Sequence, residues 1–215
     1  MSYRVDNVPW WLKILWLPYS YFIAACFYGA NLLWDKTCKK QFRNAENLDG
    51  YKNHIFCIWH ENLPAYFITN THYTKPYVWL NHPVWFMKPI HLVLSWMGTE
   101  KIVLGSSGHS GKEGLKVVIG YLNKGFNTLV STDGPHGPVK VVKDGVLQMS
   151  LKTGLPIVPV RYRMSRSFRL STWDRKIIPF PFTTIEVFYE KPVFVTEENY
   201  EFAKAELTEI LNGRT

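Results

Sequence analysis

Cysteine is scarce in this sequence, and the signals of a secreted protein are missing. The three cysteines, Cys26, Cys38 and Cys57, are an odd number and lack the close paired spacing of a zinc knuckle. We therefore expect no metal site and a reducing compartment. We also expect no secretory signal peptide, because no basic start, short apolar stretch and small-residue cleavage site occur in that order.

The sequence also lacks internal repeats, low-complexity tracts and any clear linker. Its 215 residues suit one domain with a single substantial core. Positive charge is in excess, since 25 lysines and arginines against 17 acidic residues give a net charge of +8. This excess predicts an anionic partner, which leaves nucleic acid, an anionic bilayer or a phosphate-bearing substrate.

Aromatic residues crowd the N-terminal third of the chain. Residues 8–34 carry one charge, Lys13, and a helix over this range would reach about 40 Å, more than the hydrocarbon core of a bilayer. Pro18 interrupts the stretch, and its many Trp and Tyr residues prefer the headgroup level. We expect two short helices in the membrane interface. The alternative is a core helix that covers the sheet of a soluble domain.

Four basic residues follow this stretch: Lys36, Lys39, Lys40 and Arg43. Each basic residue near an anionic bilayer contributes about 1 kcal/mol of attraction. By the positive-inside bias, the cluster predicts a protein at the cytoplasmic face of the inner (cell) membrane. We therefore divide the chain into an N-terminal membrane-associating helical segment with a basic flank, residues 1–48, and an α/β domain, residues 49–215.

Beyond Gly50, short apolar runs alternate with stretches of helical period, which is typical of α/β proteins. The expected strands cover residues 55–59, 77–80, 101–104, 126–131, 156–162 and 184–189. The expected helices cover residues 112–123, 144–153 and 197–212, with Thr196 as the N-cap of the last. The predicted fold class is α/β, a single domain with a mixed, mainly parallel sheet flanked by helices.

The candidate site residues follow three of these strands. Asn81-His82-Pro83 ends one strand, and Gly105-Ser106-Ser107-Gly108 ends another with backbone N–H groups that can bind an anion. Asp133-Gly134-Pro135-His136-Gly137-Pro138 follows a third strand as a turn. A lone histidine at a strand end is more often a cap or a satisfied polar group than a base. The order of the segments therefore carries the argument.

This order resembles the four blocks of the lysophospholipid acyltransferase (PlsC-like glycerolipid acyltransferase) superfamily: an Asn-His strand end, a glycine-bearing strand end, an acidic-Gly turn and a Val-Pro-Val strand. The likeness is closest to an uncharacterised bacterial branch whose third block reads Asp-Gly-Pro-x-Gly-Pro, as residues 133–138 do. That branch also has a Ser-Trp-Asp segment before an Ile-Pro-x-Pro-Phe run, matched here by residues 171–174 and 178–182. The likeness covers residues 55–195.

The resemblance implies a membrane-associated enzyme that transfers a fatty acyl chain from acyl-CoA or acyl-carrier protein to a hydroxyl of a lysophospholipid or related lipid. It implies no cofactor besides this acyl thioester, and it makes His82 the general base. The residues that would bind the substrate are Asn81, Gly105, Ser106, Ser107, Gly134, Pro135 and Gly137. Lys140, Arg161 and Arg163 are further basic candidates for a phosphate or headgroup.

The sequence departs from the superfamily at the partner of the base. An Asp is expected five positions after the histidine, where Met87 stands, or two positions after it in the bacterial branch, where Val84 stands. Neither side chain accepts a useful hydrogen bond. One hypothesis is that a distant carboxylate substitutes, with Asp133 and Glu61 as candidates and His60 as a second base. The other is a catalytically inactive, lipid-binding relative.

Two further functions are disfavoured by the residues themselves. A nucleotide-binding P-loop needs Gly at Ser106 and Ser or Thr at Glu113, after Lys112. Nucleic-acid binding would place the basic residues on a recognition helix or an aromatic strand pair, whereas here they follow an aromatic apolar stretch. The positive charge is therefore assigned to lipid.

Overall fold

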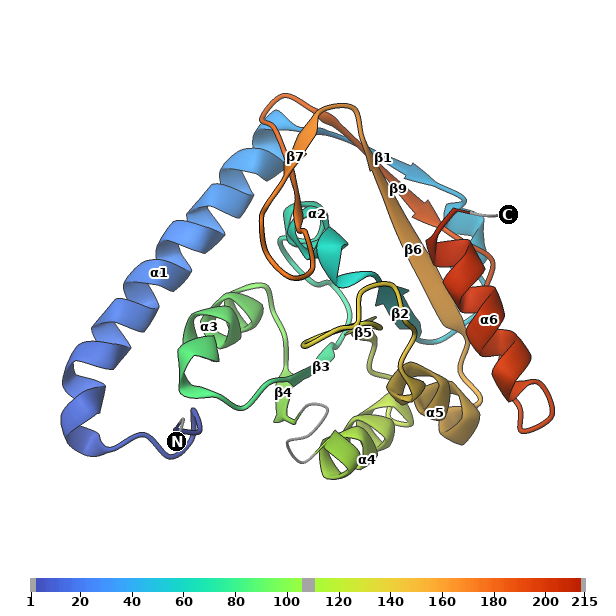
Figure 1. Cartoon of the computed structure of the whole chain (residues 1–215), viewed down its shortest axis with the longest axis horizontal. Coiled ribbons are helices and arrows are strands. Elements are labelled where there is room, and N and C mark those ends of the chain that lie inside the picture. The colour runs from blue at the N-terminus through green and yellow to red at the C-terminus, as the bar shows by residue number, and fades with distance from the viewer. Residues whose placement is uncertain (1–2, 106–110, 214–215) are drawn as a thin grey trace.

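The computed structural model describes residues 3–105 and 111–213, and its centre is a five-stranded sheet in the order β1-β9-β6-β2-β5 (Figure 1). The strands are β1 (Lys39–Arg43), β2 (Ile55–Ile58), β3 (Val78–Asn81), β4 (Lys101–Leu104), β5 (Thr128–Ser131), β6 (Ile157–Met164), β7 (Ser167–Arg169), β8 (Ile177–Pro179) and β9 (Thr184–Tyr189). β2 runs parallel to β5 and β6, and β1 parallel to β9, whereas β6 and β9 are antiparallel. The predicted mixed, mainly parallel sheet is confirmed.

Helices cover both faces of this sheet. They are α1 (Trp10–Thr37), α2 (Leu63–Thr69), α3 (Lys88–Trp96), α4 (Gly111–Leu122), α5 (Asp144–Thr153) and α6 (Tyr200–Leu211), with the short 3-10 helices η1 (Ala45–Leu48), η2 (His60–Asn62) and η3 (Trp85–Met87). One hydrophobic cluster joins α1, α2 and α3 to the sheet, and a second joins α4, α5 and α6 to it. Along β2, Ile58 lies in the first cluster, and Cys57 and Trp59 lie in the second, because successive side chains of a strand alternate between its faces.

The parallel pair β3–β4 extends the sheet beyond β5. Tyr77 bridges Asn127 in parallel, and the Thr128 hydroxyl donates to the Val78 carbonyl at 2.8 Å. β4 is in turn parallel to β3. The strands β2, β5, β3 and β4 therefore share one direction, and their carboxyl ends lie at one edge.

α1 corrects the expectation of two short helices. It is a single helix that contains Pro18, and its buried residues Trp16, Ser20, Ala24 and Asn31 lie along one face. Tertiary contacts hold the helix on both sides of the proline. The Trp16 indole donates to the Trp85 carbonyl before Pro18, and the rings of Tyr28 and Trp96 pack 5.8 Å apart after it. Pro18 itself is exposed, so the hydrogen bond lost at this position is lost on the solvent side.

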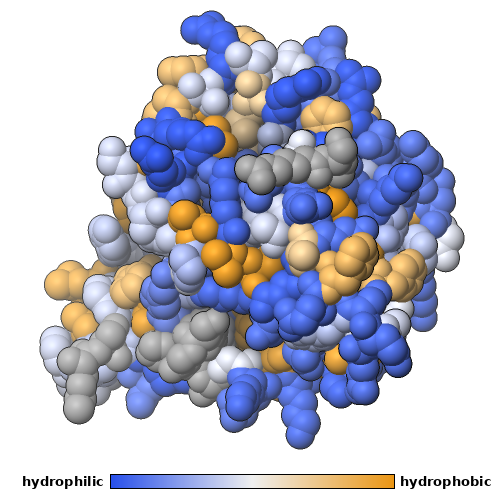
Figure 2. All heavy atoms as spheres, turned by 45° about the vertical axis from the view of Figure 1, so that its right-hand side comes forward, coloured by the Kyte–Doolittle hydropathy of each residue, from blue (hydrophilic) through white to orange (hydrophobic). Residues whose placement is uncertain are grey.

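The outer face of α1 is apolar and aromatic. Trp10 is 76% exposed and Leu15 is 78% exposed, and Trp11, Ile14, Tyr19 and Phe22 are exposed beside them. None of the helices within the described ranges is long and apolar enough to cross a membrane. Figure 2, in which the right-hand side of Figure 1 comes forward, shows hydrophilic side chains over much of that face, with apolar side chains gathered at several places between them.

The basic cluster after α1 is part of the sheet, which sequence analysis did not anticipate. Lys39, Lys40 and Arg43 belong to β1, which pairs with β9. Lys40 forms an ion pair with Asp35, and Arg43 forms one with Glu186 at 3.1 Å. The segment 1–48 therefore contributes a strand to the sheet of the α/β domain as well as a helix.

The other predicted elements agree with the structure, with one correction. All six expected strands are present, and the expected helices correspond to α4, α5 and α6. Thr196 is not the N-cap of α6. The helix starts at Tyr200 after Asn199, and the Thr196 N–H donates to the Asn199 side chain, because this reciprocal turn satisfies both residues before the helix begins.

Two glycines with different backbone conformations, Gly154 and Gly120, test the bounds of α5 and α4. Gly154 ends α5 with φ +69°, whereas a Cβ at Gly120, in α4, would meet no atom within 4 Å. We expect Gly154→Ala to lower the free energy of unfolding by about 1 kcal/mol, since a left-handed conformation strains an L side chain. Gly120→Ala should raise it by about 0.5–1 kcal/mol. Urea unfolding of both variants measures the difference, and equal signs would contradict the helix ends described here.

Candidate functional site

The site forms where the carboxyl ends of β2, β3, β4 and β5 meet at one edge (Figure 1). The residues that follow these ends are His60, His82, Gly105 and Asp133. In α/β proteins, ligands bind in the crevice outside such strand ends. The structure therefore brings three of the predicted segments to one place.

His82 follows β3 and lies against the turn after β5. Its ring is 5.4 Å from the ring of His136, and the two rings are nearly perpendicular. The residues after His82 are held by the N-terminal segment, because the Val5 N–H donates to the Pro83 carbonyl at 2.7 Å. The structure thus brings His82 and the turn of residues 133–138 together. The assignment of His82 as a base stays a prediction.

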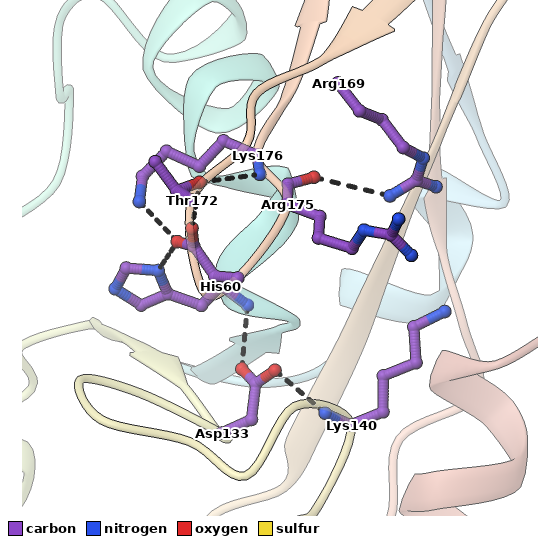
Figure 3. Close-up of polar contacts among 8 residues, drawn as sticks. His60, Asp133, Lys140, Arg169, Thr172, Arg175 and Lys176 are labelled. Carbon is purple, nitrogen blue, oxygen red and sulfur yellow. Dashed lines mark hydrogen bonds and ion pairs between the residues drawn. The ribbon is translucent and has the colours of Figure 1, made fainter.

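Asp133 is buried and binds backbone groups with both carboxylate oxygens (Figure 3). Oδ1 accepts from the His60 N–H at 2.8 Å, and Oδ2 accepts from the Lys140 N–H at 3.0 Å. The Lys143 ammonium donates to the Gly134 carbonyl at 2.9 Å. Asp133 therefore fixes the turn to the end of β2, and its oxygens are engaged in that task.

His60 forms a short imidazole–carboxylate contact. Its Nδ1 lies 2.5 Å from Oδ2 of Asp174, whose side chain is 0% exposed (Figure 3). The Thr172 hydroxyl donates to Oδ1 of Asp174 at 2.6 Å, and the Lys176 ammonium binds Oδ2 as well. Asp174 lies in the loop between β7 and β8, so this contact joins the hairpin to the end of β2.

Two glycines of the turn permit its close approach to this pair. A Cβ at Gly134 would stand 2.6 Å from Cδ2 of His60, and one at Gly137 would stand 3.2 Å from the Trp173 ring. The Trp173 and His60 rings lie 5.2 Å apart. The His60 imidazole is therefore enclosed by the turn on one side and by Trp173 on another, which explains why both positions are glycine.

The charges around His60 set its protonation. Burial lowers the pKa of His60, Asp174 opposes that change, and the Lys176 ammonium reinforces it. Burial acts to raise the pKa of the Asp174 carboxyl, but hydrogen bonds from Lys176, Thr172 and His60 hold it at about 2. At neutral pH, Asp174 is a carboxylate that only accepts, so Nδ1 of the neutral imidazole carries the proton and Nε2 carries the lone pair.

Basic side chains lie near this pair, on Asp174 and on the neighbouring Glu61. The Arg169 guanidinium donates to Glu61 at 2.6 Å, and the Lys140 ammonium lies 3.6 Å from the same carboxylate. Figure 3 shows the Lys176 ammonium beside the carboxylate that contacts His60, whereas the side chains of Arg169, Arg175 and Lys140 extend away from the imidazole. Lys140 lies beside Glu61, and its role as a headgroup ligand stays a prediction.

The other two basic candidates lie elsewhere. Arg161 pairs with Glu190 at 2.5 Å and Arg163 pairs with Glu186 at 2.6 Å, on the β6–β9 surface. They were further basic candidates for a phosphate or headgroup, and each is paired with a carboxylate of β9 or of the residue that follows it. Their role as headgroup ligands stays a prediction.

The glycine loop is described only at its start. The Gly105 N–H donates to the Asn81 carbonyl at 2.8 Å, so the ends of β3 and β4 stay in register. A Cβ at Gly114, in α4, would stand 3.5 Å from the Gly105 Cα, which shows how closely the helix approaches. Ser106 and Ser107, predicted to bind substrate, lie outside the described residues.

Sequence analysis did not assign a role to Asp174, Trp173, Thr172 or Lys176. A signal was present, because residues 171–174 are the Ser-Thr-Trp-Asp segment of the resemblance. Nothing in the spacing tied that segment to His60, since 114 residues separate the two partners.

The approach of Gly134 to His60 gives a direct test. Gly134→Ala should displace the imidazole toward solvent and raise the pKa of His60 toward 6.5, because burial is the main cause of its low value. Histidine ring resonances followed by NMR over pH 4–8 measure this change. Gly145→Ala is the matched control, since a Cβ there meets nothing within 4 Å. An unchanged His60 titration in Gly134→Ala would contradict the packing described here.

Comparison with known proteins gives one relative and one solved structure. No family model matches the chain. It is 30% identical over 165 residues to the uncharacterised protein RP090 of Rickettsia prowazekii, an alignment that covers 75% of this chain and 71% of RP090. Its fold is similar to that of the 1-acyl-sn-glycerophosphate (LPA) acyltransferase PlsC from Thermotoga maritima, with a TM-score of 0.53, 16% identity and coverage of 94% of this chain and 96% of the other.

The likeness to PlsC confirms the fold that the sequence resemblance implied, and it extends over nearly the whole chain. At this level of identity, it concerns the fold. The relationship to RP090 concerns the sequence itself and covers more than two thirds of both proteins. The chain belongs to the protein family of RP090 and has a PlsC-like α/β fold.

Proposed function

We propose that this protein is a membrane-associated acyltransferase that moves a fatty acyl chain from an acyl thioester to a hydroxyl of a lysophospholipid or related lipid. The observation that carries the proposal is the gathering of His60, His82 and His136 around the turn of residues 133–138, at the carboxyl edge of a fold similar to PlsC. Imidazoles at such an edge suit a reaction that needs one proton removed and returned.

The reaction requires a general base and a site that binds both substrates. An imidazole takes the proton of the acceptor hydroxyl while its oxygen attacks the thioester carbonyl carbon. The carbon–sulfur bond then breaks, and the departing thiolate receives the proton. The sequence resemblance gives the base role to His82, and no cofactor beyond the acyl-CoA or acyl-carrier protein donor takes part.

The charge of the site supports a phosphate-bearing substrate. Lys176 lies on the Asp174 carboxylate, Arg169 and Lys140 lie on the neighbouring Glu61, and Arg175 extends to the same side as Arg169 (Figure 3). Charge-assisted hydrogen bonds from such groups bind phosphate well. Asn81, Gly105, Gly134, Pro135 and Gly137 are proposed to line the binding site, because they belong to the same strand ends and turn. Both a lysophospholipid and CoA carry the phosphate that this arrangement would recognise.

The outer face of α1 supports contact with a bilayer. The excess of positive charge in the sequence is the reason to propose the cytoplasmic face of the cell membrane. The exposed Trp and Leu side chains of α1 are the types that enter the interfacial region. The hairpin of β7 and β8 adjoins this helix, because the Trp34 indole donates to the Pro179 carbonyl at 2.8 Å. Phe168 and Phe182 of that hairpin region are exposed as well. The acyl acceptor would therefore reach the site from the membrane on which α1 lies.

An inactive lipid-binding relative is the second candidate function. Met87 favours it, because a thioether stands in η3 where the superfamily carries the Asp partner of its histidine. This candidate predicts lipid binding without product, whereas the first predicts a new diacylated lipid. An assay of lipid binding and acyl transfer in vesicles distinguishes the two functions.

Purified protein in phospholipid vesicles should convert a lysophospholipid and an acyl thioester to a diacyl phospholipid, measured by mass spectrometry of the lipid. The double variant His60→Gln/His82→Gln should lose this activity about 10²–10⁴-fold, because it removes both candidate bases. His72→Gln, an exposed histidine outside the site, is the matched control. Wild-type protein that binds the vesicles but yields no product with acyl-CoA or acyl-carrier protein would establish the inactive relative instead.

Membrane contact through α1 is tested by a surface variant. Trp10→Ser/Leu15→Ser should weaken co-sedimentation with phosphatidylethanolamine–phosphatidylglycerol vesicles by about tenfold or more, since each buried side chain contributes about 1.5–3 kcal/mol. Val117→Ser/Phe202→Ser removes exposed apolar side chains from α4 and α6 and should leave binding unchanged. Equal binding by both double variants would place the membrane contact elsewhere.

A further inference from the structure

We infer that His60, oriented by the Asp174 carboxylate, is the general base of the transfer. This inference rests on the proposed function and deepens it, because it assigns the proton transfer to a histidine for which no motif spacing gives the role. Asp174 acts through His60, so it is a positioning residue.

The contact itself is the first argument. Nδ1 of His60 lies 2.5 Å from a carboxylate whose side chain is fully buried. A second hydrogen bond, from the Thr172 hydroxyl, and the Lys176 ammonium fix the orientation of that carboxylate. A carboxylate held in this way fixes the tautomer and plane of an imidazole and stabilises the imidazolium that forms during the reaction.

The free face of the ring is the second argument. The side chain of His60 is 18% exposed, and no hydrogen-bond partner of Nε2 is recorded in residues 3–105 and 111–213. The backbone of Gly134 lies beside Nε2, where a Cβ would stand 3.3 Å away. The glycine therefore keeps a side chain away from the one nitrogen that can take a proton, and the exposed fraction of the ring gives an acceptor hydroxyl access to it.

Electrostatics supports the same role. Because burial lowers the pKa of His60, the ring is neutral at pH 7 and able to accept a proton. Asp174 and Asp133 favour the charged ring, whereas Lys176 disfavours it. The charged groups that face the imidazole are thus two carboxylates and one ammonium, which lets the imidazolium form in the transition state without a lasting charge in the resting site.

The proton balance closes within this pair. The acceptor O–H bond breaks and its proton passes to Nε2 of His60, while the oxygen forms a bond to the thioester carbonyl carbon. The carbon–sulfur bond then breaks, and the leaving thiolate takes the proton from Nε2. His60 returns to the neutral ring, and Asp174 stays ionised throughout.

Kinetics of the full chain in vesicles, with a lysophospholipid and the thioester that the wild type uses, test the inference. His60→Gln and Asp174→Asn should each lower kcat about 10²–10⁴-fold. The double variant should be as active as the less active single variant, because paired groups act as a unit. Asp174→Glu should recover part of the loss. His82→Gln should retain more activity than His60→Gln. His72→Gln and Asp144→Asn, both exposed, are matched controls.

A readout independent of activity separates positioning from folding. The pKa of His60, followed by NMR, should fall further in Asp174→Asn and rise in Lys176→Met, since these two side chains act on the ring in opposite directions. If Asp174 had a purely structural role, the Asp174→Asn and Lys176→Met variants would not shift the pKa of His60 in opposite directions.

The outcomes are distinct. Activity that survives His60→Gln and disappears in His82→Gln overturns the inference and leaves the proposed function standing. Wild-type protein without acyl transfer overturns both. An unchanged His60 pKa in Asp174→Asn overturns the positioning role of Asp174.

Discussion

The carboxylate of Asp133 holds together the parts of the molecule that carry the site. It is buried and accepts hydrogen bonds from the backbone N–H groups of His60 and Lys140, one at the end of β2 and the other beyond the glycine–proline turn. A buried carboxylate needs such donors, because an unpaired one is costly. The turn is thereby folded back over β2, which places Gly134 against His60 and His136 against His82.

That constraint explains why the turn of residues 133–138 contains two glycines. Gly134 and Gly137 are small because aromatic and imidazole rings stand where their side chains would be. The carboxylate of Asp133 holds the turn in place, whereas the carboxylate that contacts the His60 imidazole comes from the hairpin of β7 and β8. Within the turn, Asp133 thus fixes the backbone, whereas Gly134 and Gly137 leave space for the neighbouring rings.

Much of the sheet could be predicted from sequence, because its central strands are short apolar runs bounded by turn residues. β2, β5 and β6 are buried on both faces and stand out for that reason. β1 was missed because it reads as a basic cluster, and β7 and β8 were missed because three residues each give no period. Pro18 was over-weighted as a helix breaker, since local chemistry does not reveal the contacts of Trp16 and Tyr28 that hold α1 on both sides.

The sequence predicted the parts of the candidate site that follow strand ends. It did not predict the contact between residues that are far apart in the sequence. His82 and the Asp133 turn follow β3 and β5, so parallel strands bring them to one edge. The partner of His60 lies 114 residues away, on a hairpin inserted between β6 and β9, and no local pattern encodes that approach. Glu61, a sequence candidate for an orienting carboxylate, is instead paired with Arg169 of the same hairpin.

The alternation of side chains along β2 makes the reading frame of this strand a property of the site. Ile58 and Trp59 enter opposite cores, and His60 follows them directly. One residue inserted into or deleted from β2 would exchange its two faces, so the isoleucine would meet the helices that now enclose the tryptophan. His60 would then leave β2 on the wrong side of the sheet. The position of the imidazole therefore depends on the number of residues in β2.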